Sequence, residues 1–119
     1  MKRKLRNEKS RIHKHKNMDI DSSFTLDQWV ETLEYFDNSC AYCGKTVELT
    51  QDHFIPVSKG GKYIKGNVIP ACLFCNVDKG TKTDSEFVRW YSRQLFYSKS
   101  RLTKLSKFLK DHSTARSQI

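Results

Sequence analysis

The sequence has few hydrophobic residues and no long apolar run. Its longest apolar stretches are only a few residues long, as in residues 71–74, so we expect neither a membrane-spanning segment nor a secretory signal. Hydrophobic residues make up 37% of the 119 residues, which is little apolar surface for one small domain to bury. Internal repeats and proline-rich linkers are absent as well. We therefore expect one soluble, cytoplasmic domain that needs support beyond its apolar core.

Acidic residues are outnumbered, and the positive charge lies at the two ends of the chain. The sequence has 22 Lys and Arg against 13 Asp and Glu, a net charge of +9. Residues 1–17 carry eight basic residues against one acid, and residues 99–119 carry six against one. Such ends are typical of proteins that bind a polyanion. We interpret residues 1–17 as a disordered basic arm and residues 18–119 as the folded domain, and we expect the arm to hold DNA contacts at Lys2, Arg3, Lys4 and Arg6.

The four cysteines occur as two Cys-x-x-Cys pairs with 28 residues between them. Each pair forms a turn that can present two thiolates, and two such knuckles complete a closed tetrahedral site. A pair of disulfides would need an oxidising compartment, and thioredoxin-like redox chemistry would need only one pair. The spacing therefore favours a structural zinc ion held by Cys40, Cys43, Cys72 and Cys75. Zinc would supply stability that the small core lacks.

Hydrophobic spacing predicts an α+β fold. Apolar residues on one face predict a helix over residues 25–36, with Thr25 and Gln28 as a capping box. Short strands are expected over residues 46–49 and 52–57. The second knuckle is expected to open a helix that Gly80 ends, and two further helices are expected within residues 85–111. The aromatic residues of these helices are predicted to lie in the core.

A polar group is interleaved with the four cysteines. Asp52 and His53 lie inside the loop that a zinc ion would close, and Asn76 directly follows Cys75. One structural metal ion would therefore fix the placement of these side chains relative to one another.

Several stretches resemble the HNH endonucleases: DHFIPVSKGG at residues 52–61, GNV at residues 66–68, and Cys-x-x-Cys-Asn-x-x-Lys-Gly at residues 72–80. The resemblance covers residues 38–84, and it is strongest to members with two zinc knuckles, including phage homing and packaging-associated nucleases. It implies a small ββα-metal core, flanked here by an N-terminal helix and C-terminal helices. By resemblance, His53 is the general base, Asn67 the second motif residue and Asn76 the third, where many relatives have histidine. Asp52 and Asn76 would hold a catalytic Mg²⁺ or Mn²⁺.

The chemistry of these side chains agrees with that resemblance. Phosphodiester hydrolysis needs a deprotonated water and positive charge at the phosphate. A neutral imidazole suits the first task, and hard carboxylate and amide oxygens suit a magnesium ion. Adjacent residues of a regular strand, however, point to opposite faces. We therefore predict irregular backbone at residues 50–54, which would let Asp52 and His53 face one phosphate.

The sequence thus predicts a metal-dependent DNA endonuclease whose lysines near the site contact phosphates. These candidate contacts are Lys59, Lys62, Lys79 and Lys82. Two other functions remain open: a zinc-stabilised DNA-binding module without catalysis, and a ribonuclease or toxin that uses the same motif.

Overall fold

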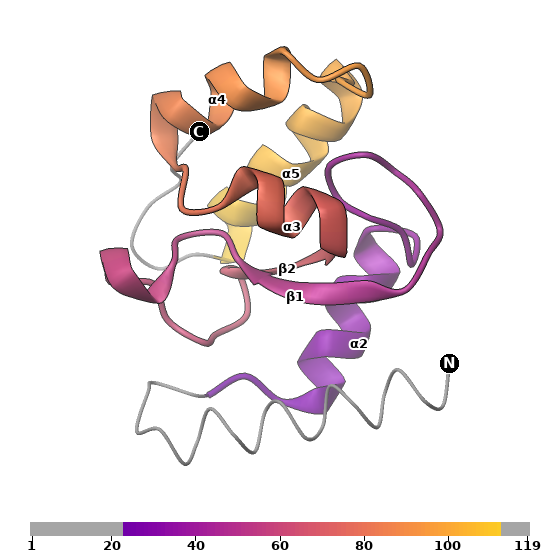
Figure 1. Ribbon diagram of the computed structural model, residues 1–119. Coiled ribbons are helices and arrows are strands. Elements are labelled where there is room, and N and C mark those ends of the chain that lie inside the picture. The colour runs from indigo at the N-terminus through magenta and orange to yellow at the C-terminus, as the bar shows by residue number, and fades with distance from the viewer. Residues whose placement is uncertain (1–22, 113–119) are drawn as a thin grey trace.

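The computed structural model describes residues 23–112. The predicted basic arm, with Lys2, Arg3, Lys4 and Arg6, lies outside the described residues. The described chain runs α2 (Leu26–Tyr35), β1 (Leu49–His53), η1 (Val57–Lys59), β2 (Val68–Cys72), α3 (Leu73–Lys79), α4 (Asp84–Ser92) and α5 (Lys99–His112). The two strands form an antiparallel sheet, and α3 lies across it (Figure 1). The fold is α+β, as the sequence predicts.

Helix α2 begins at the predicted capping box. The Thr25 side chain accepts a hydrogen bond from the Gln28 backbone, and the Gln28 side chain accepts one from the Thr25 backbone. Both bonds satisfy backbone donors that a helix start leaves open. The apolar face buries Trp29 and Leu33, and α2 contacts β2. Aromatic contacts also join its end to α5, where Phe36 packs on Phe108.

The strands differ from the sequence-based expectation. One strand, β1, replaces the two expected over residues 46–49 and 52–57, and it pairs with β2 from Leu49 opposite Cys72 to His53 opposite Val68. After His53 the Phe54 amide still donates to the backbone carbonyl of Asn67, but the Ile55 amide donates to the Asn67 side chain, and the strand ends. The predicted irregular backbone at residues 50–54 is also wrong for residues 50–53, which form a regular strand.

Helix α3 starts within the second knuckle and ends at Gly80, as predicted. Helix α4 lies on the side of α3 away from the hairpin (Figure 1), and the Trp90 indole N–H donates to the Asp78 carboxylate of α3 at 2.8 Å. The predicted core aromatics Trp29, Phe87, Trp90 and Tyr91 are all buried. Among the described residues, no helix has the length and hydrophobicity that crossing a membrane requires.

Candidate metal centre and nuclease site

The four cysteines come together in the structure. Their sulfur atoms all lie within 4.8 Å of one another, and the Sγ atoms of Cys43 and Cys72 are 3.8 Å apart. Four sulfurs bound at about 2.3 Å to one tetrahedral ion lie at similar separations. The cysteines form no disulfide. Their arrangement therefore fits a four-coordinate ion that prefers sulfur ligands, such as zinc.

Both knuckles are shaped by local backbone contacts. The amide of Cys43 donates to the Cys40 sulfur, and the amide of Cys75 donates to the Cys72 sulfur, both at 3.5 Å. Gly44 has φ of +80°, a conformation that favours glycine at the end of the first turn. Amides directed at sulfur stabilise the thiolate form that a metal ion needs.

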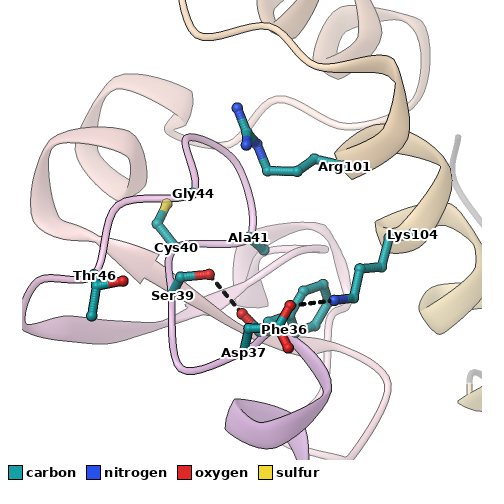
Figure 2. Close-up of a pocket in the computed structure, with 9 residues that line it drawn as sticks. All are labelled: Phe36, Asp37, Ser39, Cys40, Ala41, Gly44, Thr46, Arg101 and Lys104. Carbon is teal, nitrogen blue, oxygen red and sulfur yellow. Dashed lines mark hydrogen bonds and ion pairs between the residues drawn. The ribbon is translucent and has the colours of Figure 1, made fainter.

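Helix α5 holds the first knuckle from outside. The Arg101 guanidinium donates to the carbonyl oxygens of Tyr42 and Phe96, and it packs over Gly44 (Figure 2). The Tyr91 hydroxyl donates to the same Tyr42 carbonyl at 2.7 Å. A side chain at Gly44 would collide with the guanidinium, so this contact gives a second reason for glycine there. The knuckle is thus fixed by protein contacts as well as by its sulfurs.

The clustered thiols have displaced pKa values. A hydrogen bond from Cys75 lowers the pKa of Cys40 to about 5. Burial raises the pKa of Cys43 to about 11. One thiolate shared among close thiols accounts for these opposite shifts, because each further negative charge is disfavoured by the first. A divalent cation would remove that repulsion and allow all four to ionise.

Asp52 lies in β1 and faces α3. Its Oδ2 accepts a hydrogen bond from the Tyr42 hydroxyl at 2.6 Å and lies 3.3 Å from the Lys79 ammonium nitrogen. The Asp52 residue is only 4% exposed. Burial raises the pKa of Asp52, while Lys79 and Tyr42 act in the opposite direction. One oxygen of the predicted metal ligand is therefore committed to protein partners.

Lys79 is an internal residue. Its side chain is fully buried, and its ammonium group also donates to the carbonyl oxygens of Phe54 and Gly80. Burial lowers the pKa of Lys79, and the Asp52 carboxylate opposes that shift. Lys79 is one of the predicted phosphate contacts, but in the structure its side chain is buried and its charge is paired with Asp52 inside the protein. It ties the end of α3 to the end of β1.

His53 is the last residue of β1, and its ring stacks on that of Tyr63 with centroids 5.6 Å apart. The Tyr63 hydroxyl donates to Gln51, two residues before His53. His53 and Gln51 therefore share the face of β1 opposite to the face that carries Asp52. The structure does not bring Asp52 and His53 onto one face. Asp52 and His53 are neighbours in sequence at the end of β1, but their side chains leave the strand on opposite faces.

Asn76 lies on α3 and reaches across to β1. Its side-chain amide nitrogen donates to the Thr50 hydroxyl at 2.8 Å. Thr50 in turn donates to the Ala71 carbonyl oxygen of β2. Thr50 and Asp52 lie on the same face of the strand, so the structure places Asn76 and Asp52 on one side of the hairpin. The amide oxygen of Asn76 makes no hydrogen bond within residues 23–112, and the residue is half-buried.

Asn67 holds the loop that follows His53. Its side chain accepts from the Ile55 amide at 2.8 Å and donates to the carbonyl oxygens of Ile55 and Lys62. Its backbone carbonyl accepts from Phe54. All these partners lie within the chain that leaves β1, so Asn67 fixes the position of the strand end at His53.

The remaining predicted lysines are exposed or partly exposed. Lys59 donates to the Thr81 carbonyl oxygen and lies 3.6 Å from the Glu86 carboxylate. Lys82 donates to the carbonyl oxygens of Asp78 and Lys79, and Lys62 is exposed. Sequence reasoning missed Tyr42 and Thr50, which bond directly to the predicted ligands. Only the placement of Tyr42 between Cys40 and Cys43 could have pointed to it.

The hairpin, the helix across it and the four-cysteine cluster all lie within one segment of the chain that resembles a known family. Residues 40–92 match the family model for HNH endonucleases. The chain is also 34% identical, over 125 aligned positions, to the SPbeta prophage-derived candidate HNH endonuclease YoqL of Bacillus subtilis (strain 168). That alignment covers 91% of this chain and 49% of YoqL, so the chain spans about half the length of this relative.

Proposed function

We propose that this protein is a metal-dependent endonuclease that hydrolyses phosphodiester bonds in DNA. The observation that carries the proposal is the contact between Asn76 and Thr50, which brings the last motif residue of α3 onto the strand that ends in His53. Asn76 directly follows Cys75, so a structural ion bound by the four cysteines would also fix the start of α3, the helix that carries Asn76. The match to HNH endonucleases over residues 40–92 supports a nuclease.

His53 is the proposed general base. A neutral imidazole there would take a proton from a water molecule, whose oxygen then attacks phosphorus as the bond to the 3′ oxygen breaks. The products would carry a 5′ phosphate and a 3′ hydroxyl. Because His53 ends β1, a phosphate at the end of the hairpin can be reached by residues from both faces of the strand. Asn67 is the proposed positioning residue, since it holds the chain that follows.

Two ions are part of the proposal. Zinc is the proposed occupant of the cluster formed by Cys40, Cys43, Cys72 and Cys75. Asn76 and Asp52 are the proposed ligands of a catalytic Mg²⁺ or Mn²⁺. The donor set fits in part: the Asn76 amide oxygen is open to a hard cation, whereas one Asp52 oxygen is held by Tyr42 and Lys79. When bound, this ion would offset negative charge that develops on the phosphate.

The test is cleavage of supercoiled plasmid by the zinc-loaded protein, with Mg²⁺ or Mn²⁺ added and withheld. The proposal expects nicked or linear product only when the divalent ion is present. A folded RNA offered in parallel separates a ribonuclease from a deoxyribonuclease. DNA that stays intact across both ions would contradict the proposal.

A second candidate is a zinc-stabilised DNA-binding module without catalysis. The burial of Asp52 in an ion pair with Lys79 favours it, because a carboxylate neutralised by lysine attracts a cation less strongly. Under this alternative the protein shifts DNA in a gel-mobility assay without cutting it, and His53→Ala leaves the DNA affinity unchanged.

A further inference from the structure

A hollow of about 270 Å³ lies along α4, and half of the residues that line it are basic. Arg89 lies on this helix, Arg93 caps its C-terminal end four residues later, and Lys82 precedes it. Gln94 and the buried Trp90 complete the wall, and Glu86 is its acidic member. We call this the α4 groove. Residues four apart on a helix lie on one side, so both guanidinium groups line the same hollow.

Most basic side chains of the α4 groove have no carboxylate partner within the described residues. Among residues 23–112, neither Arg89 nor Arg93 pairs with a carboxylate, and both are exposed. Lys82 donates only to backbone carbonyl oxygens, which leave its charge uncompensated. Glu86 lies 3.6 Å from Lys59, so its charge is partly offset.

The larger hollow, of about 340 Å³, provides the contrast. There the Lys104 ammonium is 2.9 Å from the Asp37 carboxylate (Figure 2). Arg101 donates to two carbonyl oxygens. Its basic side chains serve the fold. Those of the α4 groove remain available to a ligand.

Contacts join the α4 groove to the elements that carry the candidate nuclease site. Lys82 follows α3, the helix that carries Asn76, and the bond from Trp90 to Asp78 fixes α4 against α3. On the other side, Lys59 of η1 donates to the Thr81 carbonyl oxygen. Chain leaving His53 and chain leaving Asn76 therefore meet beside the groove.

We propose that the α4 groove binds the phosphate backbone of double-stranded DNA beside the cleaved bond. This inference rests on the proposed function and adds Arg89 and Arg93 to the substrate contacts. Guanidinium groups match phosphate oxygens with paired donors, and an exposed site allows binding without base specificity. The α4 groove supplies affinity, and the chemistry stays with His53.

The test is DNA binding by the zinc-loaded protein without added Mg²⁺, so that no cleavage is needed. Fluorescence anisotropy with a labelled duplex between 50 and 200 mM NaCl gives the salt dependence of affinity. Loss of two phosphate contacts in Arg89→Ala/Arg93→Ala should make the slope of log affinity against log salt shallower by about 1.8. The loss of affinity should therefore be about tenfold larger at 50 mM than at 200 mM NaCl.

A matched control removes two exposed charges elsewhere. Lys99→Ala/Lys110→Ala, on α5, changes the net charge equally and should change the slope less than the groove variant does, because these lysines lie outside the groove. Arg89→Lys/Arg93→Lys should keep most of the slope, because the charges remain. Two results with DNA would overturn the inference: equal slope changes in both alanine variants, or an unchanged slope in the Arg89→Ala/Arg93→Ala protein. It would also be overturned if the Arg89→Ala/Arg93→Ala substitutions weakened binding to duplex RNA but not to duplex DNA. If the groove binds DNA as expected but plasmid is never cut, the proposed nuclease fails and the groove stands.

Discussion

The ammonium nitrogen of Lys79 lies 3.3 Å from Oδ2 of Asp52, and both side chains are buried. The pair joins the end of α3 to β1, and Tyr42 from the first knuckle donates to the same oxygen. Three segments that carry the metal and nuclease residues thus meet at one carboxylate. A buried ion pair of this kind stabilises a particular arrangement only while both partners are present.

Lys79→Met is expected to destabilise the protein by about 3–5 kcal/mol, because it leaves the Asp52 carboxylate buried without its cation. Urea unfolding of the zinc-loaded protein measures the change. The double variant Asp52→Asn/Lys79→Met removes both charges and should recover part of the loss. A single-variant loss below about 1 kcal/mol would show that the pair does not hold these segments together.

The zinc cluster is expected to be required for folding. Purified protein should contain one zinc ion per chain by atomic spectrometry, and Cys72→Ser should abolish cooperative thermal melting. The physical reason is the small core, which a metal ion supports by closing the chain between the two knuckles. A strong chelator should have the same effect on the unaltered protein. Cooperative melting that persists in the metal-free protein would contradict a structural role.

Asn67→Ala should lower the free energy of unfolding by about 1–3 kcal/mol, because it removes three side-chain hydrogen bonds to the loop after His53. Asn67→Asp is the informative partner variant. It keeps an acceptor for the Ile55 amide but directs a carboxylate at two carbonyl oxygens, so it should be at least as unstable as alanine. An aspartate variant as stable as the natural protein would refute this account of the loop.

Asn76→Ala should raise the Mg²⁺ concentration needed for half-maximal cleavage without unfolding the protein, because it removes the proposed oxygen ligand. Thr50→Val is the control: it removes the hydrogen bond to Asn76 but keeps the amide oxygen. A plasmid-cleavage titration compares them. An unchanged Mg²⁺ requirement in Asn76→Ala, or an equal shift in both variants, would remove Asn76 as a ligand.

The elements set by local sequence could be predicted, and the contacts between distant segments could not. The capping box of Thr25 and Gln28 and the end of α3 at Gly80 depend on residues a few positions apart, so their pattern is visible in the chain. The cysteine cluster was predictable because two Cys-x-x-Cys pairs are a spacing typical of zinc sites.

The end of β1 was not predictable in the same way. The backbone that follows β1 is held by the Asn67 side chain, which accepts a hydrogen bond from the Ile55 amide, and Asn67 is distant in sequence. The burial of Lys79 was also hidden, since a lysine near a predicted phosphate site is usually at the surface and only the placement of Asp52 explains it. The regular strand through His53, which places Asp52 on the face opposite to His53, was likewise not predicted.

The most direct test of the nuclease proposal is the single-turnover rate of plasmid cleavage by His53→Ala with Mg²⁺ and saturating protein. His112→Ala, a histidine on α5 that packs on Phe108, is the matched control. The account predicts a loss of at least about 100-fold for His53→Ala, with unchanged DNA affinity and a normal rate for His112→Ala. Cleavage by His53→Ala at the rate of the natural protein would contradict it.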